Sequence, residues 1–244
     1  MRPVIDVDWV EIPAGVLHRG TPIEEIDEVV ARHDDLGLPL SYFLKEVPRH
    51  TVEVPAFAIS RTPVTRAQWN VIAAAAGLPL APSDGPDLPV DGVAWDDAQA
   101  FCATLRDVTG LPVHLPSETQ WERAARGDET REYPWGDEWD PHAGNTAAHG
   151  VGAPLPVGSL PGGASPFGVL DLAGNVDEWT RDLFAPYPGA PSGVPDDEPW
   201  ANDRHVTRGG RFTQDRDLAR CARRHSLYDD QTGAGVRLVL DADA

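Results

Sequence analysis

The segment Leu115-Pro-Ser-Glu-Thr-Gln-Trp121 and its continuation Ala124-Ala-Arg-Gly127 contain a complete helix signal. Ser117 is followed three residues later by Gln120, and at this spacing the two side chains satisfy the free amide groups of a first helical turn. Gly127 is a residue at which a helix readily ends. The segment therefore predicts a short helix that begins after Ser117 and ends at Gly127.

Three other segments carry the same signals, with Thr or Asp followed three residues later by Glu or Gln and with a glycine at the end. They are Thr21 with Glu24 ending at Gly37, Thr65 with Gln68 ending at Gly77, and Asp96 with Gln99 ending at Gly110. In the last of these helices Phe101, Cys102 and Leu105 recur at helical spacing, which predicts that Cys102 faces the core.

Residues with strand propensity form only short runs, at 8–13, 51–59, 206–212 and 236–240. The 24 prolines and 23 glycines are spread through the chain as turn markers, and no internal repeat is present. A chain of 244 residues can bury one sizeable core, and eight tryptophans supply large apolar side chains for it. The sequence therefore predicts a single loop-rich domain over residues 1–244.

The charge of the chain narrows the classes of partner. With 39 acidic against 20 basic residues the formal net charge is −19, which repels phosphate backbones and anionic membranes and favours cationic ligands or basic partners. An alternative explanation of this acidity is a solvated surface that keeps the protein soluble and binds no charged partner. No apolar stretch is long enough to span a bilayer and residues 1–13 do not look like a secretory leader, so the expected location is cytoplasmic, without nucleic-acid or membrane partners.

Short motifs run in order along almost the whole chain. They are Trp9-Val-Glu-Ile-Pro-Ala-Gly15, Glu46-Val-Pro-Arg-His50, Pro63-Val-Thr65 with Trp69, residues 115–127, Pro134-Trp-Gly136, Asn145, Phe167-Gly168, Gly174-Asn-Val-Asp-Glu-Trp179, Arg208-Gly-Gly210, Cys221-Ala-Arg-Arg224 and Gly235-Val-Arg237. This series resembles the formylglycine-generating-enzyme (sulfatase-modifying-factor) superfamily. The resemblance implies an α+β, C-type-lectin-like fold with little regular secondary structure, in which the terminal strands meet and a shallow central cleft faces solvent.

The family pattern is weak between Asp6 and Leu44. Leu17-His-Arg-Gly20 replaces the usual Met-Gly turn, and the predicted helix at residues 21–37 is an insertion. We expect this insertion to act as a lid over the cleft or as a dimer contact, and the oligomeric state stays open.

Members of the superfamily often bind structural calcium, a hard cation that prefers oxygen ligands. The resemblance places that site at Asp171, Gly174, Val176 and Glu178, with two carboxylates and two main-chain carbonyls. The alternative is a tight turn closed by hydrogen bonds from amides to carboxylates, without an ion. A second family calcium site, at Asn145 and Thr146, needs an acid in residues 147–155, and because none is present we expect that site to be lost.

The family's own reaction uses two cysteines that follow the Arg-Gly-Gly strand and bind copper(I), an ion that suits soft thiolates. In this sequence Gln214 occupies the first position, and the loop that would carry the second is shortened. The resemblance therefore implies that the chain does not generate formylglycine by the copper–thiolate route. Cys102 and Cys221 are expected to be isolated, buried and unreactive thiols.

Other positions of the family cleft are also changed. Asp177 replaces a tryptophan and Arg211 replaces a small residue, so that Asp177, Arg211 and Gln214 are the candidate catalytic residues of a polar cleft. Such an arginine suits a carboxylate ligand, and an adjacent aspartate can hold the arginine or accept an amine. The alternative is an Asp177–Arg211 salt bridge that fills a dead cleft.

The eight histidines form no HxH or HExxH motif. If an iron or copper centre exists, we expect its ligands to be His205 and His225 together with Asp177 or Asp215, because the two histidines flank the C-terminal strands that form the cleft.

Two classes of function follow from these expectations. In the first, the chain is a divergent oxidoreductase, dependent on a metal and on oxygen, that performs an oxidative tailoring or maturation step on a small molecule or peptide in the central cleft. In the second, it is a non-catalytic module with a C-type-lectin-like fold, stabilised by calcium, that binds a ligand or a protein. The fold alone does not choose between these classes.

Overall fold

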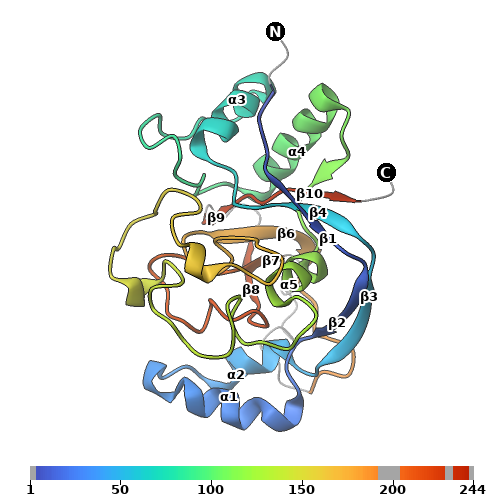
Figure 1. The fold of residues 1–244 in the computed structure, drawn as a ribbon, viewed down its shortest axis with the longest axis vertical. Helices are drawn as coiled ribbons and strands as arrows, with labels where there is room; N and C mark the ends of the chain where they lie inside the picture. The colour runs from blue at the N-terminus through green and yellow to red at the C-terminus, as the bar shows by residue number, and fades with distance from the viewer. Residues whose placement is uncertain (1–3, 192–203, 229–232, 242–244) are drawn as a thin grey trace.

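A computed structural model describes residues 4–191, 204–228 and 233–241 (Figure 1). Its α-helices are α1 (Ile26–Arg32), α2 (Leu40–Phe43), α3 (Arg66–Ala76), α4 (Trp95–Thr109) and α5 (Glu118–Arg126). Short 3₁₀ turns are η1 (Ile23–Glu25), η2 (Asp34–Leu36), η3 (Leu44–Glu46), η4 (Ala147–His149) and η5 (Pro161–Gly163). The strands are β1 (Trp9–Ile12), β2 (Gly15–Arg19), β3 (His50–Val54), β4 (Phe57–Ser60), β5 (Val113–His114), β6 (Asp177–Leu183), β7 (Arg204–Arg208), β8 (His225–Tyr228), β9 (Ala234–Gly235) and β10 (Val239–Asp241).

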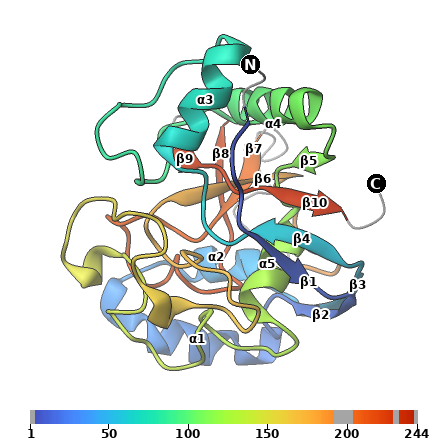
Figure 2. The same cartoon turned by 45° about the horizontal axis from the view of Figure 1, so that its top comes forward.

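Two four-stranded sheets and one two-stranded ribbon organise these elements. The first sheet has the order β1-β4-β10-β5, so the first and last strands lie on either side of β4, as Figure 2 shows. The second sheet, which we call the cleft sheet, has the order β8-β7-β6-β9. All its pairs are antiparallel except β6 with β9. The loop-rich α+β architecture expected from the resemblance is confirmed. The terminal strands lie in one sheet as expected, but they do not pair with each other, because β4 separates them.

Two predicted helices begin and end where their capping chemistry places them. Thr65 and Ser117 each form a complete capping box, with Gln68 and Gln120 respectively, and α3 and α5 end at glycines with positive φ. The cap predicted at Asp96 is wrong: α4 begins one residue earlier, and Asp96 lies within its first turn.

The cap predicted at Thr21 is also wrong. Its amide donates to the carbonyl oxygen of Glu46, and the buried Thr21 precedes a segment that divides into η1, α1 and η2 instead of one helix.

The strand predicted over residues 51–59 is two strands in different sheets. The first part, β3, pairs with β2, and the second part, β4, pairs with β1 and β10. Pro55, between them, has no amide hydrogen for a ladder. The strand predicted over 206–212 ends at Arg208, because Gly209 and Gly210 have φ values of 95° and 73°.

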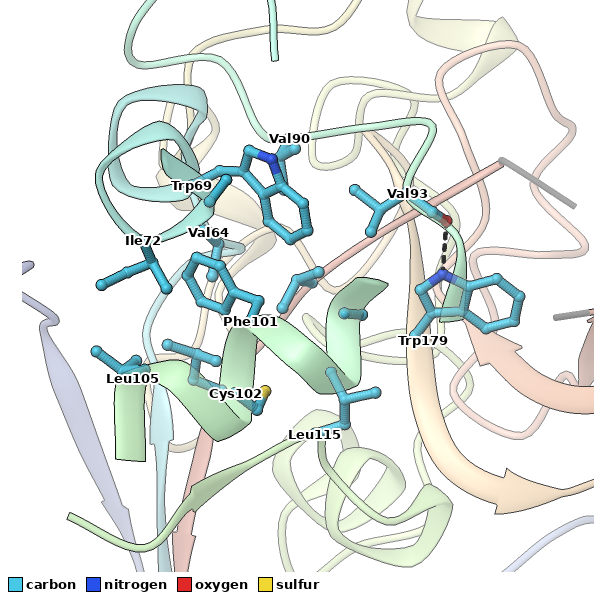
Figure 3. Packing of buried hydrophobic residues seen from close by; sticks show 14 of the residues in the cluster. Val64, Trp69, Ile72, Val90, Val93, Phe101, Cys102, Leu105, Leu115 and Trp179 are labelled. Atoms are coloured by element: carbon cyan, nitrogen blue, oxygen red, sulfur yellow. Dashed lines mark hydrogen bonds between the residues drawn. The ribbon is translucent and has the colours of Figure 1, made fainter. Parts of the chain in front are cut away.

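The core is divided between two large clusters. One lies where α3 and α4 pack together, with the rings of Trp69 and Phe101 stacked at a centroid distance of 4.9 Å (Figure 3). Its edge is closed by Trp179, whose indole N–H donates to the Val93 carbonyl at 2.9 Å. The other surrounds Trp121 of α5.

The inserted helix α1 and the segment that follows the insertion share a small core, made by Ile26, Val29, Phe43 and Val47. In Figure 1, α1 and α2 lie at the opposite end of the molecule from α3 and α4. Among the described residues no helix is both long and apolar enough to cross a membrane.

Candidate functional site

A cavity of about 450 Å³ opens beside the start of β8. Its walls come from the segment around α2, from β7 and β8, and from the loop after the Arg-Gly-Gly strand. The lining residues are Leu38, Tyr42, Lys45, Arg204, Thr213, Gln214, Asp215, Asp217, Leu218, Arg223, His225 and Ser226. The segment after the insertion contributes Leu38, Tyr42 and Lys45 to the wall, whereas no residue of the insertion itself, 21–37, lines this cavity. Whether the insertion moves as a lid or joins two copies stays a prediction.

A buried aspartate holds the histidine of this cavity. Asp177 is only 1% exposed, and its Oδ2 lies 3.2 Å from His225 Nδ1. Its Oδ1 accepts a hydrogen bond of 3.2 Å from the main-chain amide of Gly210. Because the carboxylate accepts at Nδ1, it favours the imidazole tautomer with the proton on Nδ1 and leaves Nε2 as the basic nitrogen. The side chain of His225 is 32% exposed, so it is reachable from the cavity.

Arg211 is held by a different acid from the one considered in the sequence. Its Nη2 lies 2.6 Å from Asp91 Oδ2, and no Asp177–Arg211 ion pair forms among the residues that the structure describes. The main-chain amide of Arg211 donates to Gln214 Oε1 at 2.7 Å, which closes the turn that presents Gln214 to the cavity. Burial raises the pKa of Asp91, although the neighbouring Arg211 opposes that rise. Asp91 follows Pro89-Val in a loop before α4, and only its Asp-Gly turn marks it in the sequence.

The two histidines proposed for a redox metal do not share one set of ligands with an acid. The ring of His205 stacks on Trp95 at a centroid distance of 3.6 Å, whereas His225 contacts Asp177. Across the described ranges, no group of three or more His, Cys, Asp or Glu side chains is arranged to hold a metal ion. The donor set named from the sequence therefore does not fit an iron or copper ion in this arrangement.

The two thiols are isolated, as expected. Cys102 belongs to the cluster beside α4 and Cys221 to the cluster around Trp121, and both are free and fully buried. Burial raises the pKa of each thiol to about 12. At neutral pH both therefore remain protonated, which disfavours thiolate chemistry.

At one end of the predicted calcium loop, Glu178 forms an ion pair with Arg237. Both oxygens of Glu178 are engaged, because Arg237 donates to each of them at 2.6 and 2.7 Å and the Trp121 indole donates to one at 2.7 Å. Asp171 is different. Its Oδ2 accepts one amide hydrogen bond from Gly158 at 2.7 Å, and burial raises its pKa. A half-buried carboxylate of this kind suits a cation, whereas Glu178 is already paired with Arg237. Calcium at this loop stays a prediction.

The other two members of that set, Gly174 and Val176, lie in the turn before β6. A side chain at Gly174 would meet the carbonyl oxygen of Asn145 at 2.2 Å, so only glycine fits there. At the second family site, the amide group of Asn145 donates to the Ala153 carbonyl and to Asn175 Oδ1, each at 3.0 Å. These bonds close the loop without an acidic residue.

Behind the cavity lies a buried network of arginines and acids that the motifs alone did not reveal. Glu118 Oε1 accepts from Arg208 at 3.1 Å and from Arg224 at 2.6 Å, and its Oε2 accepts from Arg19. Burial alone would raise the pKa of Glu118, but these three arginines outweigh it and hold the pKa well below its usual range. The network fixes the strands that carry the cavity residues.

A second cluster of ion pairs reaches the cavity wall at Asp217. Its Oδ2 accepts from Arg223 Nε at 2.6 Å, and its Oδ1 accepts from Arg220 at 3.2 Å. In the sequence Glu118 falls in the helix predicted after Ser117, and Asp217 falls in none of the predicted elements. Neither has a local signal for its ionic role, because their partners lie far along the chain or in an irregular loop.

Comparison with known proteins identifies relatives over nearly the whole chain. The sequence model of the family described as "Sulfatase-modifying factor enzyme 1-like domain" matches residues 6–242. A hercynine oxygenase of Mycolicibacterium thermoresistibile is 32% identical over 81% of this chain and 54% of its own length. A formylglycine-generating enzyme of Mycobacterium tuberculosis is 32% identical over 60% of this chain and 70% of its own. The chain thus spans about half the length of the hercynine oxygenases it matches.

Among solved structures, PvdO from Pseudomonas aeruginosa superposes with a TM-score of 0.75 at 27% sequence identity. The match covers 96% of this chain and 94% of that one. The similarity therefore extends over nearly the whole length of both chains.

Proposed function

The chain belongs to the family of sulfatase-modifying factor enzyme 1-like domains, and from this premise we propose that it performs an oxidative tailoring or maturation step on a small molecule or peptide bound beside His225. The observation that carries the proposal is the contact between His225 and the buried Asp177 at the wall of the 450 Å³ cavity. Oxygenases and a formylglycine-generating enzyme among the relatives support the oxidative class.

In this proposal His225 is the general base. With Nδ1 engaged by Asp177, Nε2 accepts a proton from the substrate, and Asp177 stabilises the imidazolium that results. Gln214 supplies an amide group at the same cavity for orienting the substrate, since its own Oε1 is fixed by the Arg211 amide. Arg211, paired with Asp91, has a supporting role near the cleft instead of a direct one.

An oxidation also needs an electron acceptor, and we propose molecular oxygen, in keeping with the oxygenases among the relatives. Removal of two hydrogen atoms would reduce the oxygen to hydrogen peroxide. Insertion of one oxygen atom would release the other as water and take two electrons from an added thiol reductant. The Cys102 and Cys221 thiols are excluded from this step by their burial. No step is assigned to iron or copper, because His205 and His225 do not form a ligand set.

The proposal is tested by comparing the small molecules and peptides of the source organism with and without the gene. Loss of function should leave a precursor richer by two hydrogen atoms, or poorer by one oxygen atom, than the normal product. Purified protein should convert that precursor in air and not under nitrogen. A mass profile unaffected by loss of the gene would contradict the oxidative proposal.

The second candidate is the calcium-stabilised binding module, and Asp171 is the observation that favours it. Its half-buried carboxylate has a raised pKa and one amide donor, a setting in which a bound cation would remove an energetic cost. Under this alternative the cavity binds its ligand without changing it. Unaltered ligand recovered after incubation with the protein in air would favour it over catalysis.

A further inference from the structure

A second cavity, of about 310 Å³, lies on the other side of the inserted segment. The helix α1 contributes Val29 and Arg32 to its wall, and the last residue of α5, Arg126, contributes another part. Arg49 and Glu132 complete the set that carries the argument. None of these residues lines the cavity beside His225.

Arg126 brings unused hydrogen-bond donors into this cavity. The residue is 2% exposed, and its Nε and Nη1 atoms make no hydrogen bond within the described ranges. The nearest acid is Glu122, whose Oε1 lies 3.3 Å from Arg126 Nε but already accepts from the Gly20 amide at 2.9 Å. The ion pair with Glu122 thus leaves these two buried donors without a hydrogen bond. Such donors are costly, and a ligand that accepted from them would remove that cost on binding.

Arg49 adds a second positive charge at the same wall. Its Nε donates to the Gly20 carbonyl at 3.2 Å, and among the described residues its guanidinium has no acidic partner within ion-pair distance. Burial lowers the pKa of Arg49, and the positive charge of Arg126 lowers it further. An anionic group between the two guanidinium groups would relieve this repulsion, and a carboxylate matches their fork geometry.

Glu132 presents the opposite chemistry. Its Oε2 pairs with Arg32 at 3.0 Å, while its buried Oε1 accepts no hydrogen bond in the described structure. The nearest basic nitrogens to Oε1, His33 Nε2 and Arg220 Nε, are each 3.9 Å away. Burial lowers the pKa of His33, which disfavours its charged form, and Arg220 is already held by Glu46 and Asp217. The cavity thus has an unused acceptor as well as unused donors.

The charges around the cavity balance. Four arginines line it, at positions 32, 49, 126 and 220, and so do four acids, at positions 25, 132, 137 and 138. A ligand with a large negative charge, such as a phosphate ester, would be repelled by those acids. A molecule with one positive and one negative group matches both the balance and the unused atoms.

We propose that this cavity is a binding site for a small zwitterion of the α-amino acid class, with its carboxylate on Arg49 and Arg126 and its ammonium group on Glu132. A volume of about 310 Å³ is at the small end of the range for such ligands. The site is separate from the proposed catalytic cavity, and it does not depend on the oxidative function.

The test is a calorimetric titration of the full chain with the standard L-amino acids, one at a time. We expect saturable binding of at least one of them to the wild-type protein. Acetate and methylammonium, which each carry half of the ligand's charge, should bind more weakly. Arg49→Gln and Glu132→Gln should each weaken binding roughly ten- to a hundredfold, because each removes a charged hydrogen bond.

His225→Ala is the matched control, since it alters the other cavity and should leave this affinity unchanged. Arg49 is partly exposed and Glu132→Gln is isosteric, so the two variants should keep the wild-type melting temperature within a few degrees. Failure of every amino acid to bind the wild-type protein would overturn the proposal. Binding that is lost in His225→Ala but kept in Arg49→Gln would overturn it as well, because the ligand would then occupy the cavity beside His225.

Discussion

At the scale of single residues, the contact between His225 and Asp177 is the feature on which catalysis depends. We expect His225→Ala to lower the rate of conversion of the accumulated precursor by about a hundred- to ten-thousandfold, the usual contribution of a positioned base. Asp177→Asn should lower the rate too, because an amide that donates to Nδ1 imposes the wrong tautomer. His142→Ala is the control, since His142 is exposed and does not line the cavity. Equal rates in His142→Ala and His225→Ala would remove His225 from the mechanism.

The thiols give a second prediction at this scale. Because burial raises the pKa of both Cys102 and Cys221 to about 12, an alkylating reagent at mildly alkaline pH should leave the native protein unmodified. After denaturation the same reagent should label both. Mass spectrometry of the two samples measures this directly. Labelling of one thiol in the native protein would show that its cluster opens on the timescale of the reaction.

At the scale of elements, two predicted helix caps differ in outcome: Thr65 caps α3, whereas Asp96 does not cap α4. Thr65→Ala removes a complete capping box and should lower the free energy of unfolding by about 1 kcal/mol. Asp96→Ala should cost less, because Asp96 lies in the first turn and caps nothing. Urea denaturation of the two variants compares them. A larger loss for Asp96→Ala would mean that charge near the helix dipole outweighs the capping box.

The Asp171 turn is the element at which calcium is tested. The raised pKa of Asp171 means that the folded state binds a proton there more readily than the unfolded state, so its charge reduces stability as pH rises through that window. With a chelator present, Asp171→Asn should therefore melt at the same temperature as the wild type or higher.

With calcium in hundredfold excess over its dissociation constant, the wild type should gain about 2.7 kcal/mol and Asp171→Asn should gain none. Differential scanning calorimetry with and without calcium decides the point. A wild-type melting temperature that is the same with and without calcium would refute the predicted site.

At the scale of the whole molecule, the buried ionic network should set the response to acid. The pKa values of Glu118, Glu122 and Asp217 are lowered in the folded state, since their arginine partners outweigh burial. Each therefore contributes stability above its ordinary pKa, near 4.5 for glutamate and 3.8 for aspartate, and loses it as the pH falls further. Asp91 and Asp171 act in the opposite sense.

We expect the urea midpoint of the wild type to fall steeply below a pH of about 4.5. Glu118→Gln should lower the free energy of unfolding at neutral pH by about 3–5 kcal/mol, because it leaves Arg19, Arg208 and Arg224 partly uncompensated. Its remaining stability should depend less on pH in the acid range. An unchanged pH slope in that variant would assign acid unfolding to other carboxylates.

The sequence predicts this molecule unevenly, and the reason is the distance over which each signal acts. The capping boxes of α3 and α5 are local and were located correctly, and the ordered motifs were sufficient for the fold. The division of residues 51–59 depends on partners far along the chain, so strand propensity alone merged β3 with β4. For the same reason the sequence did not predict that Asp91 pairs with Arg211 or that Glu118 binds several arginines. Arg211 lies 120 positions from Asp91, and Arg224 lies about 100 positions from Glu118.

The position of β4 has a consequence for how the protein is made. One neighbour of β4 is β1, synthesised shortly before it, and the other is β10, which is among the last described residues to leave the ribosome. Until β10 arrives, one edge of β4 and one of β5 have no pairing strand in this sheet. Such edges are open to pairing with other chains. During translation we therefore expect the nascent chain to depend on holding chaperones, with closure of the first sheet coming after synthesis of β10.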